Sequence, residues 1–370
     1  MSNRIDNRTF RARWLLARNA VLGSARFQQL AARLPVFGMI ARRKAAAQFD
    51  LVAGFVYSQI LAVFVETGLL DFLHSRFRSI AEVAGHTGLA QDAAERLLRA
   101  AESLKLAESL PEGQWTLGKA GAALWPNKGA IAMIRHHRLL YQDLSDPVRL
   151  LAENRAKQTA LSGYWTYASR ADGAGDTAGY SALMAATQPM LFEQILPTYP
   201  FHRHHRMLDI GGGSGAFAAA VKSAAPELDV AIFDLPDVTN EARVRLGNES
   251  PIALHAGSFK DDPLPGGYDL ITLIRIAHDH DDDVVVALLA KIHAALPKNG
   301  KLLLAEPMAQ SSGAERMGNA YFGLYLWAMG SGRPRSVEDY TQMLRNAGFS
   351  SVRRIKTALP LVTSVIVASR

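Results

Sequence analysis

The chain of 370 residues contains no cysteine. This absence excludes disulfides, thiolate metal sites and cysteine nucleophiles, and it is typical of a protein in a reducing compartment. The sequence also lacks any run of about eighteen uninterrupted apolar residues, and residues 1–6 lack the apolar core of a signal peptide. We therefore expect a cytoplasmic protein that is soluble or peripheral on the cytoplasmic face of the membrane.

Acidic residues are almost absent from the first 44 positions. This N-terminal arm (residues 1–44) holds nine arginines and Lys44 against a single acid, Asp6, so its net charge is +9, whereas the whole chain carries only +7. The pattern predicts a pair of basic amphipathic helices that lie on an anionic membrane. Docking against a partner subunit is an equal alternative, and nucleic-acid binding is a third. The apolar residues interleaved with the arginines are Phe10, Trp14, Leu15, Leu22, Phe27, Leu30, Leu34, Phe37 and Ile40.

An apolar fraction of 49% is enough to build cores in two domains. We expect a helical domain over residues 45–200 and a second domain over residues 201–370. The first has the element order of a winged helix, but Asp92 and Glu95 stand where DNA phosphate would approach, which argues against a nucleic-acid partner. It is expected to contain a helix over residues 45–77, a helix that begins after the N-cap Ser79, a helix over 91–104 and a hairpin over 106–117.

From Met207 onward, short apolar runs alternate with helical or turn-rich sequence. This alternation predicts an α/β domain with a mostly parallel, doubly wound sheet, whose ligands lie at the carboxyl ends of the strands. The expected strands are 207–210, 230–233, 252–255, 270–274 and 301–306, followed by an antiparallel pair over 352–356 and 362–368.

The most informative motif is a glycine-dense turn, residues 211–215, between an apolar run and a helix-forming segment. A backbone free of side chains can approach a ligand closely there. About twenty residues later, Asp234 ends a second apolar run, where a carboxylate typically binds ribose hydroxyls. The glycine spacing alone would also suit a dinucleotide. Asp209, two residues before the turn, would repel a pyrophosphate but would attract the cationic end of S-adenosylmethionine.

In order along the chain, the segments 208–215, 233–236, 257–259, 278–279 and 295–301 resemble the S-adenosylmethionine-dependent O-methyltransferases. The resemblance covers about residues 45–370. It implies a Rossmann-like catalytic domain with S-adenosylmethionine as cofactor. It also implies an N-terminal winged-helix domain that makes a homodimer, which explains a winged helix without DNA.

The resemblance also implies roles for individual residues. His278 matches the general base, which takes the proton of a substrate hydroxyl, and Glu306 matches an acid that orients it. A second acid of the plant enzymes is replaced by Pro334. The implied cofactor residues are Asp209 and the backbone of Gly211, Gly212 and Gly213 at the methionine portion, Asp234 at the ribose, Leu235, Ser258 and Phe259 around adenine, Arg275 beside the position of a family lysine, and Met184 near the reacting methyl group.

No metal-ligand cluster is evident in the sequence. Asp279, Asp281, Asp282 and Asp283 are grouped at the expected start of a helix, where acids favour the helix dipole, and we expect them to be solvated caps.

The segment 319–329 is unusually apolar and aromatic at the position of the family's substrate wall. It predicts a long hydrophobic pocket, although core packing is an equal alternative for each aromatic side chain. The candidate pocket residues are Met133, Tyr141, Trp165, Phe192, Tyr321, Phe322 and Tyr325.

Two phrases, residues 135–147 and 278–282, resemble the bacterial carotenoid O-methyltransferases that act on hydroxyneurosporene or demethylspheroidene. That resemblance implies methylation of the tertiary 1-hydroxyl of an acyclic carotenoid. The alternatives are a polyketide, phenolic or bacteriochlorophyll-type substrate for the same fold, or a winged-helix regulator without catalysis.

Overall fold

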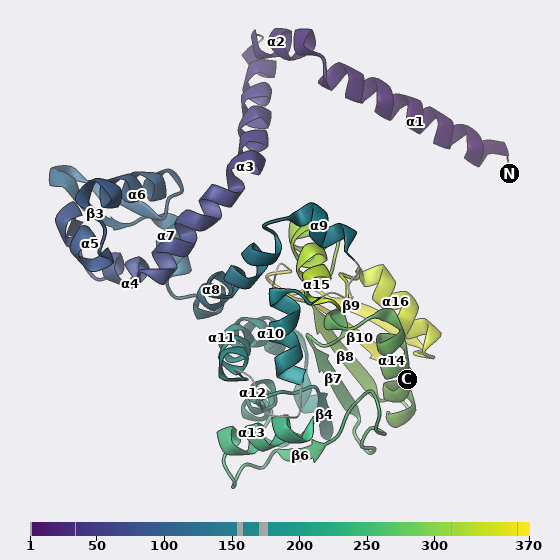
Figure 1. The fold of residues 1–370 in the computed structure, drawn as a ribbon. Coiled ribbons are helices and arrows are strands. Elements are labelled where there is room, and N and C mark those ends of the chain that lie inside the picture. The colour runs from purple at the N-terminus through teal and green to yellow at the C-terminus, as the bar shows by residue number, and fades with distance from the viewer. Residues whose placement is uncertain (1, 34, 154–157, 170–176, 312, 361) are drawn as a thin grey trace. The chain divides into compact units, whose positions relative to one another are not determined.

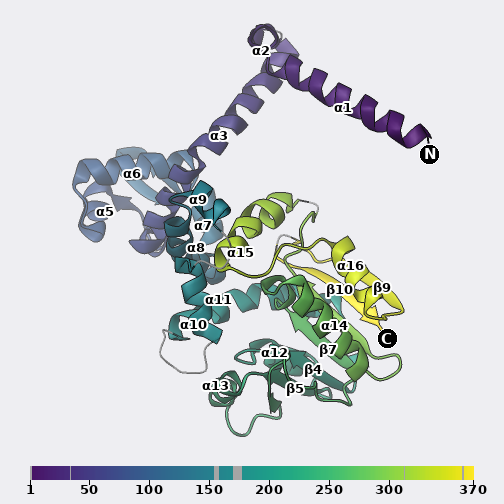
Figure 2. The ribbon, with the colours of Figure 1, turned by 45° about the vertical axis from the view of Figure 1, so that its right-hand side comes forward.

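The structure, a computed structural model, describes residues 2–33, 35–153, 158–169, 177–311, 313–360 and 362–370. It divides into two compact units, residues 1–123 and 124–370. Both units combine helices with a β-sheet (Figures 1 and 2).

The N-terminal unit begins with three helices and continues into a small mixed fold. Its helices are α1 (Ser2–Leu22), α2 (Ala25–Arg33), α3 (Pro35–Glu66), α4 (Leu69–His74), α5 (Ile80–Thr87), α6 (Gln91–Ser103) and α7 (Lys119–Leu124). Its strands are β1 (Arg78–Ser79), β2 (Ala107–Leu110) and β3 (Gln114–Leu117), in the sheet order β1-β3-β2.

The winged-helix order predicted from the sequence is confirmed in this unit. Ser79 caps α5 by accepting a hydrogen bond from the Glu82 backbone, and the Glu82 side chain accepts one from the Ser79 backbone, as a capping box requires. Strands β2 and β3 form the expected antiparallel hairpin around residues 111–113.

Helix α3 is largely exposed over its first half and packed over its last turns, where Phe64 and Val65 are buried. Its segment Gly38–Glu66 is, by length and composition, the one described helix apolar enough to cross a membrane.

The C-terminal unit is built on a seven-stranded sheet of order β6-β5-β4-β7-β8-β10-β9. The strands are β4 (Arg206–Ile210), β5 (Asp229–Asp234), β6 (Ala253–Ala256), β7 (Leu270–Ile274), β8 (Lys301–Glu306), β9 (Ser351–Ile355) and β10 (Ser364–Ser369). The first five are parallel, and β10 lies antiparallel between β8 and β9, which confirms the predicted sheet and its terminal pair.

Helices cover both faces of this sheet. Because side chains alternate along a strand, Leu208 and Ile210 of β4 enter the core under α14 (Asp282–Ala295) and α16 (Val337–Asn346), whereas Met207 enters the core under α12 (Ala216–Ala224) and α11 (Thr177–Ile195). The remaining helices are α8 (Lys128–Asp143), α9 (Pro147–Ala152), α10 (Ala160–Ser169), α13 (Pro236–Leu246) and α15 (Gly323–Met329).

The boundary between the units differs from the one expected at residue 200. Residues 124–200 belong to the C-terminal unit, because α11 packs on α12, and α8 and α10 pack on α15. Helical periodicity identified these helices but carries no information about which core receives them.

Candidate active site

The glycine turn follows β4 and brings backbone to the carboxyl end of the sheet. Gly211 and Gly213 have φ values of 67° and 56°, a region that favours glycine. A Cβ on Gly212 would lie 2.8 Å from the Ile232 side chain and 2.9 Å from Asp209 Oδ2. The turn is therefore closed to side chains, and its amides and Cα atoms form a cradle for a ligand.

Two carboxylates end the strands on either side of this turn. Asp209 is 2% exposed, and its Oδ1 accepts a hydrogen bond of 2.6 Å from Thr272 Oγ1. Burial, with a smaller contribution from the charge of Asp234, raises the pKa of Asp209 to about 7. Asp234 accepts hydrogen bonds from the backbone amides of Gly213 (2.8 Å) and Leu235 (2.7 Å). Burial raises its pKa although these hydrogen bonds oppose the rise.

His278 lies in a short 3₁₀ turn, Ala277–Asp279, after β7, and is 4% exposed. Its Nδ1 is 2.7 Å from Glu306 Oε2 and its Nε2 is 3.1 Å from Asp279 Oδ1. The ring N–H does not point along the Glu306 contact, so that contact acts mainly through charge. Burial disfavours the charged ring, but Asp279 and Glu306 outweigh burial and raise the pKa of His278 above its ordinary value.

Glu306 organises the backbone beside this histidine as well as its ring. It ends β8 and is fully buried, and its Oε1 accepts hydrogen bonds from the amides of Ile276 (3.0 Å) and Ala277 (2.7 Å). The Glu306 carboxylate therefore holds both the backbone that leads into the turn and the imidazole ring of His278.

Arg335 fixes the same turn from the opposite side. Arg335 is 1% exposed, and its guanidinium donates to the carbonyls of Ala277 (2.6 Å), the first residue of the turn, and of His280 (2.8 Å), the residue that follows it. It also pairs with Asp282 at the start of α14. The N–H donors of the planar guanidinium reach all of these acceptors at once, which a lysine ammonium would not do.

The loop after α15 closes tightly over the His278 turn. Gly332 has a φ of 77°, and a Cβ there would lie 2.1 Å from the His278 carbonyl oxygen. The Arg333 amide donates to that carbonyl (3.2 Å), and the Ser331 hydroxyl donates to the Asp279 carbonyl (2.7 Å). The stretch that in plant enzymes carries a second acid thus serves here to hold the turn.

Aromatic side chains pack against the other side of His278. The Phe322 ring meets the His278 ring edge-on at 5.9 Å, and Tyr321 and Tyr325 stack at 5.8 Å. The segment Arg316–Phe322 is a π-helix, a form that recurs at functional sites.

Two histidines of α8 hold the hydroxyls of these tyrosines. Trp165 Nε1 donates to the Tyr325 hydroxyl (3.3 Å), which lies 2.8 Å from His136 Nε2. Burial lowers the pKa of His136 to about 4, so its ring is neutral. His137 Nε2 lies 2.6 Å from the Tyr321 hydroxyl.

The other predicted pocket residues fall in different places. The Tyr141 ring meets the His137 ring edge-on, with 6.2 Å between the ring centroids. Met133 lies on α8 one turn before His137 and is half-buried. Phe192 lies apart from this group: its ring packs 5.4 Å from Phe217 in the core between α11 and α12. The Met184 side chain lies outside the described residues.

Three of the predicted cofactor residues have partners within the protein. Ser258 donates its hydroxyl to Asp261 (2.8 Å), and the Phe259 ring meets His280 at 5.2 Å. Arg275, in a left-handed conformation with φ 55°, donates to Thr187 Oγ1 (3.3 Å) and exerts its positive charge on His278.

Sequence reasoning missed the roles of Asp279, Arg335 and the two α8 histidines. The expectation of solvated caps is wrong for Asp279, which contacts His278. Asp282 lies in the first turn of α14 and is half-exposed, as expected, but it also pairs with Arg333 and Arg335. The adjacent residues His278 and Asp279 in the sequence were a signal for the role of Asp279. The contacts of Arg335 and the histidines bridge distant segments and have no local signature. Among the described residues, no group of three or more acids and histidines could hold a metal ion.

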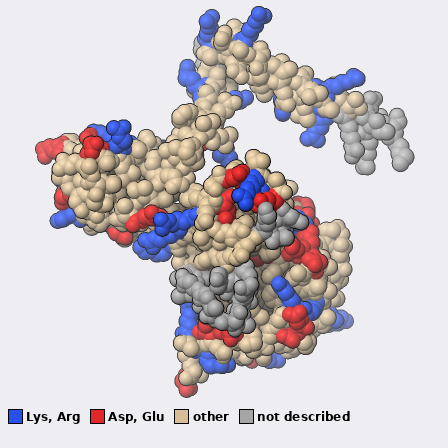
Figure 3. Space-filling model, in the orientation of Figure 1, with Lys and Arg blue, Asp and Glu red and all other residues tan. Residues whose placement is uncertain are grey.

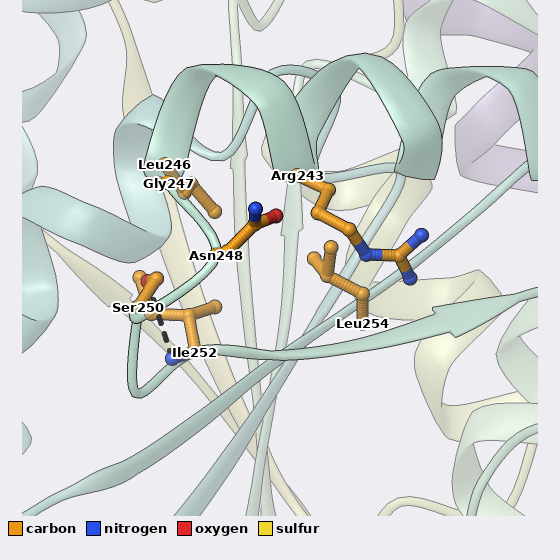
Figure 4. Close-up of a pocket in the computed structure, with 7 residues that line it drawn as sticks. All are labelled: Arg243, Leu246, Gly247, Asn248, Ser250, Ile252 and Leu254. Carbon is orange, nitrogen blue, oxygen red and sulfur yellow. Dashed lines mark hydrogen bonds between the residues drawn. The ribbon is translucent and has the colours of Figure 1, made fainter.

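A separate shallow pocket lies between the end of α13 and the start of β6 (Figure 4). Because it lies at the amino end of β6, it is away from the carboxylates that end β4 and β5. Its lining residues are Arg243, Leu246, Gly247, Asn248, Ser250, Ile252 and Leu254.

Comparison with known proteins identifies the family. The profile of the O-methyltransferase domain matches residues 141–350, and that of the O-methyltransferase dimerisation domain matches residues 49–126. The chain belongs to the O-methyltransferase family. It is 41% identical to demethylspheroidene O-methyltransferase of Rhodobacter capsulatus, over 94% of this chain and 88% of that protein. It is 38% identical to the enzyme of that name from Cereibacter sphaeroides, over 94% and 93%.

Solved structures share the fold. Human N-acetylserotonin methyltransferase, in complex with S-adenosylmethionine, superimposes with a TM-score of 0.74 at 23% identity, over 88% of this chain and 97% of that chain. The protein is thus an S-adenosylmethionine-dependent O-methyltransferase with a dimerisation domain.

The residues of this O-methyltransferase fit the cofactor. The cradle at Gly212 admits no side chain, and Asp209 is a buried carboxylate with a hydroxyl as its neighbour and, within the described parts of the chain, no cation paired with it. A cationic ligand would supply the missing countercharge.

Binding of S-adenosylmethionine should therefore depend on the ionisation of Asp209. Because this carboxyl must lose its proton to attract a cation, and because burial holds its pKa at about 7, affinity should fall about fivefold between pH 7 and pH 6. Calorimetric titration across this range measures the effect. Asp209→Asn is the control, since it retains any pH dependence that comes from titration of S-adenosylmethionine itself. Parallel profiles for the two proteins would contradict the prediction.

Arg335→Lys should impair methyl transfer by the O-methyltransferase without weakening cofactor binding. The lysine keeps the charge but cannot reach Ala277, His280 and Asp282 together, so the His278 turn loosens, and displacements of about 1 Å lower kcat by about a hundredfold. Arg333→Lys is the matched control, because Arg333 pairs with the same Asp282 but is 41% exposed. Equal effects in both variants would show that Arg335 does not position the turn.

Proposed function

We propose that this enzyme methylates the tertiary 1-hydroxyl of an acyclic carotenoid of the hydroxyneurosporene or demethylspheroidene type, with His278 as general base. The observation that carries the proposal is the His278 ring, set between Glu306 and the Phe322 wall. Identity of 41% and 38% to two demethylspheroidene O-methyltransferases supports the substrate class.

In this proposal S-adenosylmethionine supplies an electrophilic methyl group, and the substrate oxygen is the nucleophile. His278 Nε2 takes the hydroxyl proton in this proposal, exchanging its contact with Asp279 Oδ1 (3.1 Å) for the substrate hydroxyl, while Nδ1 stays against Glu306. Glu306 and Asp279 stabilise the imidazolium that results. No covalent intermediate with the protein is needed, and the proton passes to solvent after the product leaves.

We assign the cofactor to the carboxyl ends of β4 and β5. Asp209 and the backbone of residues 211–213 would hold the methionine portion, and Asp234 would bind the ribose hydroxyls through the lone pairs not used by Gly213 and Leu235. The half-exposed Leu235 side chain suits an adenine face. Ser258, Phe259, Arg275 and Met184 are further candidates for the rim of this site.

The substrate polyene would lie along the aromatic wall of α15 and α8. Its face offers apolar rings and few polar atoms, since the tyrosine hydroxyls are already bonded to histidines. The residues proposed to contact it are Met133, Tyr141, Trp165, Tyr321, Phe322 and Tyr325. Phe192, packed in the core, is the weakest of the candidates.

The proposed setting is a homodimer in the cytoplasm, in peripheral contact with an anionic membrane. The match to a dimerisation domain supports self-association. A carotenoid resides in the bilayer, so an enzyme that is not embedded must reach its substrate at the surface. We retain three functional regions: the arm (1–44), a dimerisation and substrate-lid region (45–200), and a cofactor-binding region (201–370).

The rate should follow deprotonation of His278. A base must be neutral to act, and the pKa of His278 is raised by Asp279 and Glu306, so kcat should fall as the pH is lowered through a value above 6.5. Glu306→Gln removes one negative charge and should move this acidic limb to lower pH, with kcat reduced by about tenfold or more. Single-turnover rates against pH measure it. Glu338→Gln, at an exposed position of α16, is the control; an unmoved limb in Glu306→Gln would refute the assignment.

Purified enzyme with labelled S-adenosylmethionine should transfer label to 1-hydroxy acyclic carotenoids in liposomes. His278→Ala should lose at least about a hundredfold in rate and still bind the cofactor. Product chromatography identifies the 1-methoxy carotenoid. Label in phenolic, polyketide or tetrapyrrole acceptors alone would overturn the carotenoid assignment, and cofactor binding without transfer to any acceptor would favour a regulator.

A further inference from the structure

The N-terminal arm exposes apolar side chains in a regular stripe. On α1, Phe10, Trp14 and Val21 recur at helical spacing on one face and are 73%, 55% and 49% exposed. On α2, Phe27 and Leu30 are exposed in the same way. Exposed apolar rows of this length on a soluble protein mark a surface that binds a partner.

The charge of the arm identifies what kind of partner fits. From Arg11 onward, where the side chains of the arm's arginines are described, none of them is paired with a carboxylate, and Arg18 lies over the Trp14 ring at 5.4 Å. On the face in view in Figure 3, Lys and Arg side chains are spread along α1 to α3 without acidic neighbours. Arginines beside an aromatic and aliphatic stripe are typical of helices that lie in the headgroup region of a bilayer.

The family's shared domains do not account for this element. The dimerisation domain starts at residue 49 and the O-methyltransferase domain ends at residue 350, so the arm lies outside both matches. A second copy of the arm is a poor partner, because each copy carries +9 and like charges repel. The remaining 326 residues carry a net charge of only −2, which gives little attraction for docking on a subunit.

A transmembrane position for the arm is also disfavoured. The apolar segment Gly38–Glu66 overlaps the arm only at residues 38–44, which hold Arg42, Arg43 and Lys44. Each of these charges placed in the hydrocarbon would cost about 3 kcal/mol, so the arm itself is a poor membrane span.

We propose that the arm is an interfacial anchor for an anionic phospholipid surface, with the Phe10, Trp14 and Val21 face inserted between headgroups and the arginines on lipid phosphates. The inference rests on the proposed function for its purpose, since it brings the active site to a bilayer-borne carotenoid. Its physical basis, the stripe and the unpaired charge, is independent of that substrate.

Vesicle binding by the full-length enzyme tests the anchor. The protein should sediment with vesicles of mixed phosphatidylglycerol and phosphatidylcholine, with a blue shift of tryptophan emission, and should bind pure phosphatidylcholine at least tenfold more weakly. Arg11→Glu/Arg18→Glu and Phe10→Ser/Trp14→Ser should each weaken binding to the mixed vesicles by about tenfold or more. Arg96→Glu/Arg354→Glu makes the same charge change on exposed sites of the two folded units, and it should bind like the parent.

Three results would overturn the anchor: no binding to anionic vesicles, equal binding by all variants, or loss of the dimer rather than of vesicle binding in the arm variants, measured by light scattering. Its failure is distinguishable from failure of the proposed function. His278→Ala should bind vesicles like the parent and lose methyl transfer, whereas arm variants should methylate carotenoid in detergent micelles at the parent rate and lose activity on vesicles.

Discussion

The site depends on three carboxyl groups at the ends of parallel strands of one sheet. Asp209, Asp234 and Glu306 end or nearly end β4, β5 and β8, and Asp209 and Glu306 are buried while Asp234 is half-buried. A buried carboxylate is unfavourable unless hydrogen bonds or a cation compensate it. The three carboxyl groups are compensated in different ways. These differences distinguish the carboxyl groups proposed to bind the cofactor from the one that contacts the proposed base.

Asp234 is satisfied by two backbone amides and Glu306 by two amides and an imidazole. Among the described residues, the Asp209 carboxyl has only the Thr272 hydroxyl as a hydrogen-bond partner, and the nearby charge of Asp234 raises the cost of ionising it. The carboxyl group left incompletely compensated is thus the one beside the glycine cradle. In the proposed binding mode, a cofactor with a positive charge would complete the electrostatics of the sheet edge, so that binding and relief of buried charge would be the same event.

Most of the scaffold could be predicted because its signals are local. The strands follow short apolar runs, and the capping box at Ser79 uses residues three positions apart. The motif positions Asp209, Asp234 and His278 are local in the same sense. The Arg335 contacts were not predictable, because they join segments more than fifty residues apart. The position of Phe192 also depends on packing, since an aromatic residue on a helix suits a core and a pocket equally.

The two histidine–tyrosine pairs show how an apolar wall can retain polar atoms without the cost of burying them unpaired. Trp165 can only donate, so the Tyr325 hydroxyl accepts from it, and the same hydroxyl lies 2.8 Å from Nε2 of His136, whose ring is kept neutral by burial. Two side chains therefore hold this hydroxyl. Among the described residues, the Tyr321 hydroxyl has a hydrogen-bond partner only in His137 Nε2. Because one partner holds a hydroxyl less firmly than two, the Tyr321 hydroxyl is the freer of the two to turn toward a polar group on the substrate.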